Sequence, residues 1–446
     1  MRLIYQPIYW TYRTVSSVWY WAQRRFTTAG LCVFGGFLVA GATGLDVEST
    51  VTYQSFAALL GLLLIAFAGG WKFRAQFSAV RLLPRLGTAG QMLQYRVRVR
   101  NLGQSVYRGL TLLEDPADPR PPYAQWLEYQ LAESRRVRPF RVAQRHRTHP
   151  FRRVKLKEAE VPPMLGLGEV DVTMNLVPLR RGILRFSGVT LARTDIFGLF
   201  RAFARVSVPQ TVLILPRRYP VPPLALPGVL KYQEGGVALA ANVGSSDEFV
   251  SLRDYRPGDP LRHIHWRSWA RSGRPIVKEF EDEFFVRHAL ILDTFTTEPQ
   301  SERLEEAVSV AASFACTVLT QESLLDLLFV GPQSYRFTAG RGLAHADQML
   351  EVLAAVGACP SRPFETLEHL VLNYVSLVSG CICVLLAWDE PRQQMVKKLR
   401  QLDVPALVLV IVPPGTRPEP GVMQAEPGRF HVLEIGKIEA QLAKLK

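Results

Sequence analysis

Cysteine is scarce in this sequence. Five cysteines occur among 446 residues, and none belongs to a C-x-x-C pair. This scarcity excludes a disulfide-stapled scaffold and a thioredoxin-like redox motif. Cys381 and Cys383 alternate within the apolar run CICVLLAW, and Cys32 lies in a second long apolar run. We therefore predict that the cysteines serve as small apolar side chains in a reducing compartment.

Two further features are missing, and charged residues are few. No long stretch combines low hydrophobicity with high charge, which excludes extensive disorder. No serine lies in a Gly-x-Ser-x-Gly elbow, the signature of many hydrolases. Charged residues make up only 21%, and hydrophobic residues 48%, so the chain has material for two or three cores and for membrane-embedded length.

The net charge of +14 is concentrated in one segment. Residues 135–157 hold ten Arg or Lys and no acidic residue, and the rest of the chain is close to balance. Aromatic residues are sparse there, so we predict no nucleic-acid partner. We expect a basic loop, with three interpretations open: a solvated loop, contact with anionic lipid headgroups, or contact with an acidic partner.

Two uncharged apolar runs near the N-terminus, residues 26–45 and 49–71, each reach the roughly 20 residues of a membrane span. We predict a two-helix transmembrane hairpin over 26–72, preceded by an aromatic interfacial segment over 1–25. Arg and Lys flank the hairpin, whereas its turn holds Asp46 and Glu48, so both termini are expected in the cytoplasm. A buried core hairpin is the alternative.

The alternation in QYRVRV and EVDVTMNLV predicts strands, and no long amphipathic helix is apparent between them. We expect residues 73–230 to form a β-sandwich that includes the basic loop 135–157.

Residues 231–446 are expected to hold a charged segment, described below, followed by an α/β domain whose pattern begins at about His288. Apolar strands are predicted at residues 288–293, 324–330, 382–388 and 406–412, with helices at 302–319, 344–356 and 393–402. This alternation indicates a doubly wound parallel sheet. Asp293 and Asp389 follow strands, at the edge where such sheets bind ligands.

Two motifs carry a family resemblance. The run EFVSLRDYRPGDPLRHIHWRSWARSGRPIVKEFEDE and the earlier RRGILRFSGVTLARTDIFGLF resemble the domain-of-unknown-function 58 family. The resemblance implies a bacterial inner-membrane protein whose α/β domain is similar to von Willebrand factor type A. It also implies a MoxR-type AAA+ ATPase partner. No enzymatic activity is established for that family, so the resemblance supplies no reaction.

Type A domains often bind Mg²⁺ through Asp-x-Ser-x-Ser, a Thr and a further Asp, which are the oxygen ligands that this ion prefers. Here Asp293 and Thr297 match the first motif, and Asp389 matches the later Asp. Phe295 stands where the first hydroxyl is needed, and its ring cannot coordinate a cation. These are degenerate candidates, and we predict no metal and no cofactor.

The first motif invites a search for chemistry. His263 and His265 are possible bases, and Ser251, Ser268 and Ser272 are the possible nucleophiles, but none of these serines lies in a strand–turn–helix elbow and no third metal ligand is near. We expect a charged interdomain clasp or partner-binding surface instead, with Trp266, Trp269 and Ala270 docked on the sheet and Gly273 ending their helix. Its candidate residues are Glu248, Arg253, Asp254, Tyr255, Gly258, Asp259, Arg262, Trp266 and Arg271.

The function expected is that of a membrane-anchored, non-enzymatic adaptor that binds a MoxR-type AAA+ ATPase. A Mg²⁺-dependent type A ligand binder and, third, a cell-envelope hydrolase are the alternatives.

Overall fold

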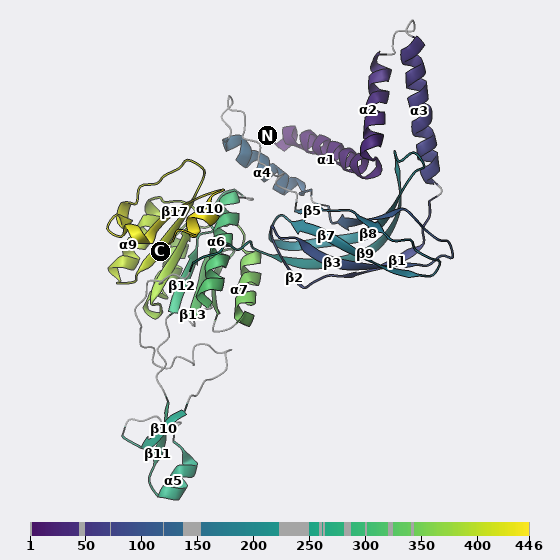
Figure 1. Cartoon of the computed structure of the whole chain (residues 1–446). Coiled ribbons are helices and arrows are strands. Elements are labelled where there is room, and N and C mark those ends of the chain that lie inside the picture. Colours follow the sequence, from purple (N-terminus) through teal and green to yellow (C-terminus); the bar gives the residue numbers. More distant parts are fainter. Residues whose placement is uncertain are drawn as a thin grey trace. The chain divides into compact units, whose positions relative to one another are not determined.

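The computed structural model describes residues 2–43, 50–71, 73–118, 120–136, 153–222, 249–257, 261, 264–280, 287–298, 301–319, 324–339 and 343–445. The chain divides into two compact units of mixed helices and sheets (Figure 1). The first comprises Met1–Arg217 with the short segments Glu298–Gln300 and Leu353–Ala355. The second comprises the remaining residues.

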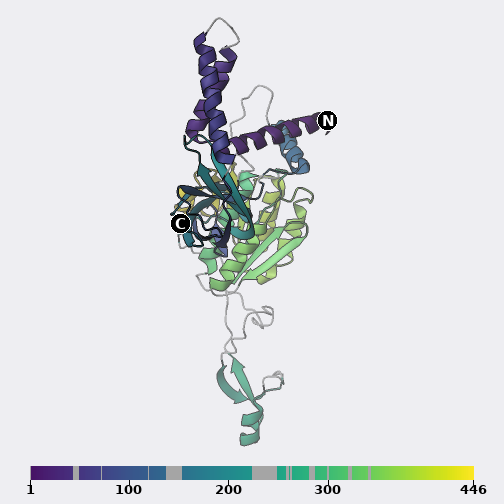
Figure 2. The ribbon, with the colours of Figure 1, turned by 90° about the vertical axis from the view of Figure 1, so that its right-hand side faces the viewer.

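Three helices open the first unit: α1 (Arg2–Arg25), α2 (Thr28–Thr43) and α3 (Thr50–Trp71). Helices α2 and α3 lie side by side, with the rings of Phe37 and Phe56 stacked 4.8 Å apart (Figures 1 and 2). Among the described residues, one helix segment, Val51–Gly70, is long and apolar enough to cross a membrane. Helix α2 is equally apolar, but its 16 residues are fewer than the roughly 20 of a span.

Some aromatic residues of helix α1 are buried against another helix, and others are exposed. Tyr9 is buried against Trp126 of α4 (Tyr123–Arg136), and its hydroxyl donates to the carbonyl of Pro121 over 3.0 Å. Trp10 and Trp19 are each 60% exposed. Helix α4 corrects the expectation that the middle of the chain lacks an amphipathic helix. The apolar side of α4 is aromatic and packs on α1. Sequence periodicity within residues 123–136 does not show this contact, because α1 lies far away in the sequence.

Two sheets complete the first unit, and their buried residues belong to one hydrophobic core. The four-stranded sheet has the order β1 (Phe77–Leu82), β3 (Leu93–Asn101), β7 (Glu169–Pro178), β5 (Val154–Leu156). The five-stranded sheet has the order β2 (Leu86–Thr88), β9 (Arg201–Leu215), β8 (Gly182–Thr194), β4 (Leu110–Pro116), β6 (Ala159–Val161). In β3, alternate residues are buried, as the alternation in the sequence predicts.

An ion pair lies inside this core. Arg81 and Glu114 have fully buried side chains and form two hydrogen bonds, of 3.0 and 2.7 Å. The hydroxyl of Tyr95 donates to Glu114 over 2.8 Å. The carboxylate, which is shielded from solvent, therefore accepts three hydrogen bonds, two from Arg81 and one from Tyr95. Such saturation is what a buried charge requires. Most of the predicted basic loop, residues 137–152, lies outside the described residues.

The second unit holds a six-stranded sheet with the order β14 (Ser334–Ala339), β13 (Leu324–Val330), β12 (Arg287–Leu292), β15 (Gly380–Leu385), β16 (Ala406–Val412), β17 (Phe430–Glu434). Its helices are α6 (Glu302–Leu319), α7 (Leu343–Ala355), α8 (Glu365–Leu372), α9 (Glu390–Gln401) and α10 (Ile438–Leu442). The sheet is parallel except for β14, which pairs antiparallel with β13. Only three residues connect these two strands, too few for a parallel crossover, so the expectation of a wholly parallel sheet was wrong at this edge.

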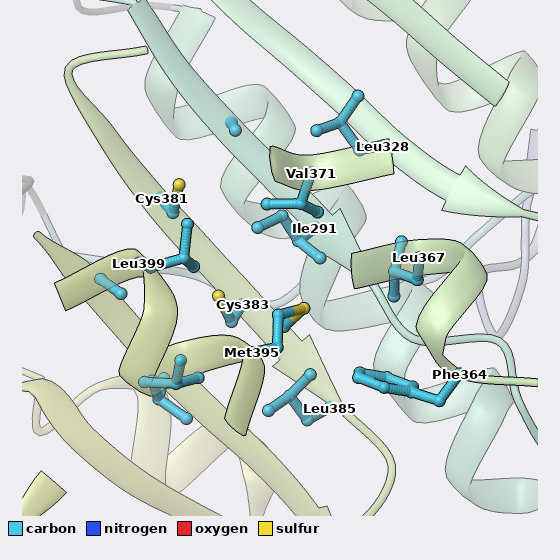
Figure 3. Close-up of a cluster of buried hydrophobic side chains, with 14 of the residues drawn as sticks. Ile291, Leu328, Phe364, Leu367, Val371, Cys381, Cys383, Leu385, Met395 and Leu399 are labelled. Atoms are coloured by element: carbon cyan, nitrogen blue, oxygen red, sulfur yellow. The ribbon is translucent and has the colours of Figure 1, made fainter. Parts of the chain in front are cut away.

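Central strands β12, β15 and β16 are buried along their whole length. Cys381 and Cys383 of β15 lie in an apolar cluster with Ile291 of β12 and Met395 of α9 (Figure 3). Burial raises the pKa of the Cys383 thiol well above its ordinary value, which keeps it protonated. The prediction that these cysteines act as small apolar side chains is confirmed for Cys359, Cys381 and Cys383, the buried three.

Candidate functional site

The carboxyl edge of the second unit's sheet holds the first candidate site. Asp293 follows β12 directly and is fully buried. Its Oδ1 accepts the backbone N–H of Phe295 at 2.9 Å, and its Oδ2 accepts that of Leu386, after β15, also at 2.9 Å. Because parallel strands end at one edge, two loops distant in sequence meet at this carboxylate.

Arg392 joins Asp293 to Asp389. Its Nε donates to Oδ2 of Asp293 over 2.7 Å, and its Nη1 donates to Oδ2 of Asp389 over 2.6 Å. Its guanidinium carbon lies 4.7 Å from the centre of the Phe364 ring. Burial alone would lower the pKa of Arg392, but the two carboxylates outweigh that effect and raise it. The group therefore stays charged between its two partners.

This arrangement does not fit a bound divalent cation. The guanidinium already supplies the positive charge that two carboxylates attract, and it occupies one oxygen of each. Thr297, the third degenerate candidate, is exposed. Within the described part of the chain, no group of three or more His, Cys, Asp or Glu residues is placed to hold a metal ion.

Sequence reasoning located Asp293 and Asp389 but missed Arg392. A signal was present in the run Asp389-Glu390-Pro391-Arg392. Asp389 is the N-cap of α9, and its Oδ1 accepts the backbone N–H of Arg392 at 3.4 Å. An N-cap Asp followed three residues later by Arg places both side chains at one helix end, where they can pair.

The second candidate site is a small module formed by β10 (Phe249–Asp254), α5 (Trp266–Ser272) and β11 (Ile276–Phe280), drawn in teal in Figure 1. The two strands pair antiparallel, with Arg253 opposite Val277. His265 donates its backbone N–H to the carbonyl of Ile276 over 2.8 Å, which ties the start of α5 to β11. Gly273 ends the helix with φ at 69°, a left-handed conformation that favours glycine, as the sequence predicts.

Five of the nine predicted clasp residues lie in the described module. They are Arg253, Asp254, Tyr255, Trp266 and Arg271. Arg253 donates to the backbone carbonyl of Asp254 over 3.3 Å, and Tyr255 donates its backbone N–H to Pro275 over 2.9 Å. The other four predicted residues, Glu248, Gly258, Asp259 and Arg262, lie outside the described residues.

The expected docking of Trp266, Trp269 and Ala270 on a sheet differs from the structure. Trp266 is 64% exposed and stacks on Trp269, with ring centres 5.2 Å apart. Ala270 is exposed, and α5 has no buried residue. A two-stranded hairpin with a seven-residue helix can bury little, and Ile264 and Val277 are its buried apolar side chains among those described.

The surface around the two tryptophans is basic. Arg256, Arg267, Arg271 and Arg274 are exposed, and so is the acidic Asp254. Trp and Arg are the residue types most enriched among binding hot spots in protein interfaces.

One candidate base lies beside a candidate nucleophile. Nδ1 of His265 lies 2.6 Å from Oγ of Ser268, three residues along the chain. Among the described residues, no carboxylate binds the other ring nitrogen, so the orienting group of a catalytic triad is absent from that part of the chain. Ser268 is in the first turn of α5, so the contact joins the N-cap residue His265 to that turn but caps no backbone N–H group.

Comparisons with known proteins find a family model that matches most of the module and part of the second unit's sheet. Residues 251–373 match the family model described as "Protein of unknown function DUF58". The chain is 28% identical over 189 residues to the "Uncharacterized protein YeaD" of Bacillus subtilis (strain 168). That match covers 42% of this chain and 45% of the relative, so it spans less than half of either protein.

Solved structures show only distant likenesses. The CARDB domain of PF1109 from Pyrococcus furiosus is 14% identical, with a TM-score of 0.16, and the match covers 30% of this chain and 95% of that one. A cohesin module from Clostridium perfringens is 7% identical, with a TM-score of 0.15, covering 31% and 97%. At such TM-scores these likenesses carry no argument about fold or function.

Proposed function

We propose that this chain, whose residues 251–373 match the family model described as "Protein of unknown function DUF58", is a membrane-anchored, non-enzymatic adaptor. Its β10–α5–β11 module binds a protein partner, and the family resemblance favours a MoxR-type AAA+ ATPase. The observation that carries the proposal is the exposed, stacked pair of Trp266 and Trp269 within the matched segment.

The partner is a protein with an apolar recess and acidic surroundings. A tryptophan that is 64% exposed leaves a large apolar area in water, and covering it on binding is favourable by about 25 cal/mol per Å². The exposed Arg267, Arg271 and Arg274 favour carboxylate-bearing partners, since guanidinium and carboxylate form paired hydrogen bonds.

The anchor consists of α2 and α3 in the bacterial inner membrane, with both termini in the cytoplasm. The apolar segment Val51–Gly70 supports the span, and exposed aromatic residues on α1 suit the headgroup layer. In this proposal the first unit's two sheets form a β-sandwich and the second unit is a type A-like domain. Two fusions after Lys446 test the orientation. Green fluorescent protein is expected to fluoresce, because the C-terminus is proposed to lie in the cytoplasm. Activity of alkaline phosphatase, which requires the periplasm, would reverse the proposed orientation.

The Arg392 bridge favours the adaptor over the metal-dependent alternative. A type A domain switched by Mg²⁺ needs free carboxylate oxygens, and Arg392 binds both Asp293 and Asp389. Calorimetric titration of the purified chain with millimolar Mg²⁺ is expected to give no saturable heat. A saturable heat that disappears in Asp293→Asn would establish the alternative instead.

Affinity measurement with a MoxR-type AAA+ ATPase of the same organism tests partner binding. Trp266→Ala is expected to weaken binding at least tenfold, since loss of a hot-spot tryptophan costs about 2 kcal/mol or more. Leu402→Ala is the matched control, because Leu402 is also an exposed apolar residue, at 51%, outside the module. Equal affinities for the wild type and both variants would remove the module from the interface.

A further inference from the structure

The turn between β8 and β9 exposes two apolar side chains at its tip. Ile196 is 96% exposed and Phe197 is 50% exposed. The apolar residues that follow in the same turn differ, since Leu199 and Phe200 are buried, at 6% and 5% exposure. The turn therefore has one apolar side that is packed and one that is open.

The packed side lies on the base of the apolar helices. Thr27 donates its backbone N–H to the carbonyl of Leu199 over 3.1 Å, and its hydroxyl donates to that of Gly198 over 2.5 Å. The same hydroxyl accepts the N–H of Gly30 at 3.0 Å in the first turn of α2. The rings of Phe26 and Phe67 each lie 5.4 Å from that of Phe200.

These contacts fix the depth of the turn along α3. Leu199 and Phe200 share a cluster with Leu62 and Ala66, which lie inside the apolar segment Val51–Gly70. At 1.5 Å of rise per residue, Ala66 is about 6 Å and Leu62 about 12 Å from the Gly70 end of that segment. The buried side of the turn therefore lies beyond the Gly70 end of α3, beside the apolar residues 62–66.

The backbone N–H groups of residues 197–200 are all bonded within the turn. Asp195 accepts N–H groups from Phe197 at 3.1 Å, Leu199 at 2.7 Å and Phe200 at 2.6 Å. Gly198 donates to the carbonyl of Asp195 over 3.0 Å. Irregular backbone at membrane depth requires such internal hydrogen bonding, because lipid offers no partner.

We propose that Ile196 and Phe197 insert into the lipid bilayer as a second point of membrane contact beside α2 and α3. This inference rests on the proposed membrane anchor. The open apolar tip continues the apolar surface of the helices on which the turn is packed. Arg25, at the end of α1, supplies positive charge for the headgroup layer next to it, whereas Arg24 is paired with Asp115.

Spin-label accessibility in the full chain tests the proposal. Ile196→Cys is labelled with a nitroxide in a background with Cys32→Ala and Cys316→Ala, and the protein is placed in nanodiscs of phosphatidylethanolamine and phosphatidylglycerol. Relaxation by oxygen reports lipid, and relaxation by a water-soluble nickel chelate reports water. Leu64→Cys, on α3 at 59% exposure, is the lipid control. Met92→Cys, between β2 and β3 at 69% exposure, is the water control.

The oxygen-to-nickel ratio at position 196 is expected to exceed that at position 92 several-fold and to approach that at position 64. A water-like ratio at 196 with a lipid-like ratio at 64 would overturn the insertion and leave the anchor intact. Low accessibility to both reagents at 196 would assign the tip to a protein contact and also overturn it. A water-like ratio at 64 would remove the anchor itself. Phe197→Cys repeats the measurement with an independent variant.

Discussion

Arg392 donates from Nε to Oδ2 of Asp293 over 2.7 Å, and both side chains are nearly inaccessible to solvent. Removing one member of such a pair leaves the other charge buried without a partner, which costs about 3–5 kcal/mol. Arg392→Ala is therefore expected to destabilise the second unit by that amount. Urea-dependent hydrogen exchange of peptides from β12 and β15 measures this unit separately from the first.

Arg429→Ala is the control for this prediction. Arg429 pairs with Glu426 over 2.8 Å, but both side chains are substantially exposed. Exposed pairs contribute about 0–1 kcal/mol, so this variant should leave the exchange of β12 nearly unchanged. Similar losses in the two variants would mean that the buried bridge contributes no more than a surface pair.

Gly30 offers a second prediction, because a Cβ there would lie 2.0 Å from the carbonyl oxygen of Leu199. Gly30→Ala is expected to displace the β8–β9 turn from α2, at a cost of about 1–3 kcal/mol. The change is measured as faster amide exchange in peptides that contain Thr27 and Leu199. In the same helix Gly35 has no atom within 4 Å of its Cβ position, so Gly35→Ala should leave exchange unaltered. Equal exchange in the two variants would contradict the close contact.

The buried His288 makes the stability of the second unit depend on pH. Burial lowers the pKa of His288 to about 4, whereas the unfolded value is about 6.5. Between these values the unfolded chain binds a proton that the native chain does not, so stability is complete above pH 6.5 and falls as the pH drops toward 4. The loss is at most about 3 kcal/mol.

His288→Gln should flatten this part of the stability profile, measured by urea unfolding of the second unit between pH 4 and 7. His369→Gln, at an exposed position on α8, should retain the slope of the wild type. A wild-type slope in His288→Gln would assign the pH dependence to other groups.

Apolar periodicity predicted much of the second unit from the sequence. The predicted ranges 302–319, 324–330 and 406–412 coincide with α6, β13 and β16. These elements are long, strongly apolar and separated by turn residues, so local pattern and tertiary burial agree. Asp293 and Asp389 were located for the same reason, because each follows an apolar strand.

Features decided by contacts distant in sequence were not predictable in the same way. Helix α4 owes its buried side to Tyr9 of α1, more than a hundred residues earlier. The partner of Arg392 depends on which loops meet at the sheet edge. The exposure of Trp266 was missed because helical spacing shows which residues share a face, but not whether anything covers that face.

Partner binding by the module is tested most directly by site-specific photo-crosslinking in intact membranes. Benzoylphenylalanine replaces Trp266 in one strain and Leu402 in a control strain, each co-expressing a MoxR-type AAA+ ATPase of the same organism with an affinity tag. The account predicts a covalent adduct between this chain and the ATPase from position 266 and none from position 402. An adduct from 402 with none from 266 would contradict it.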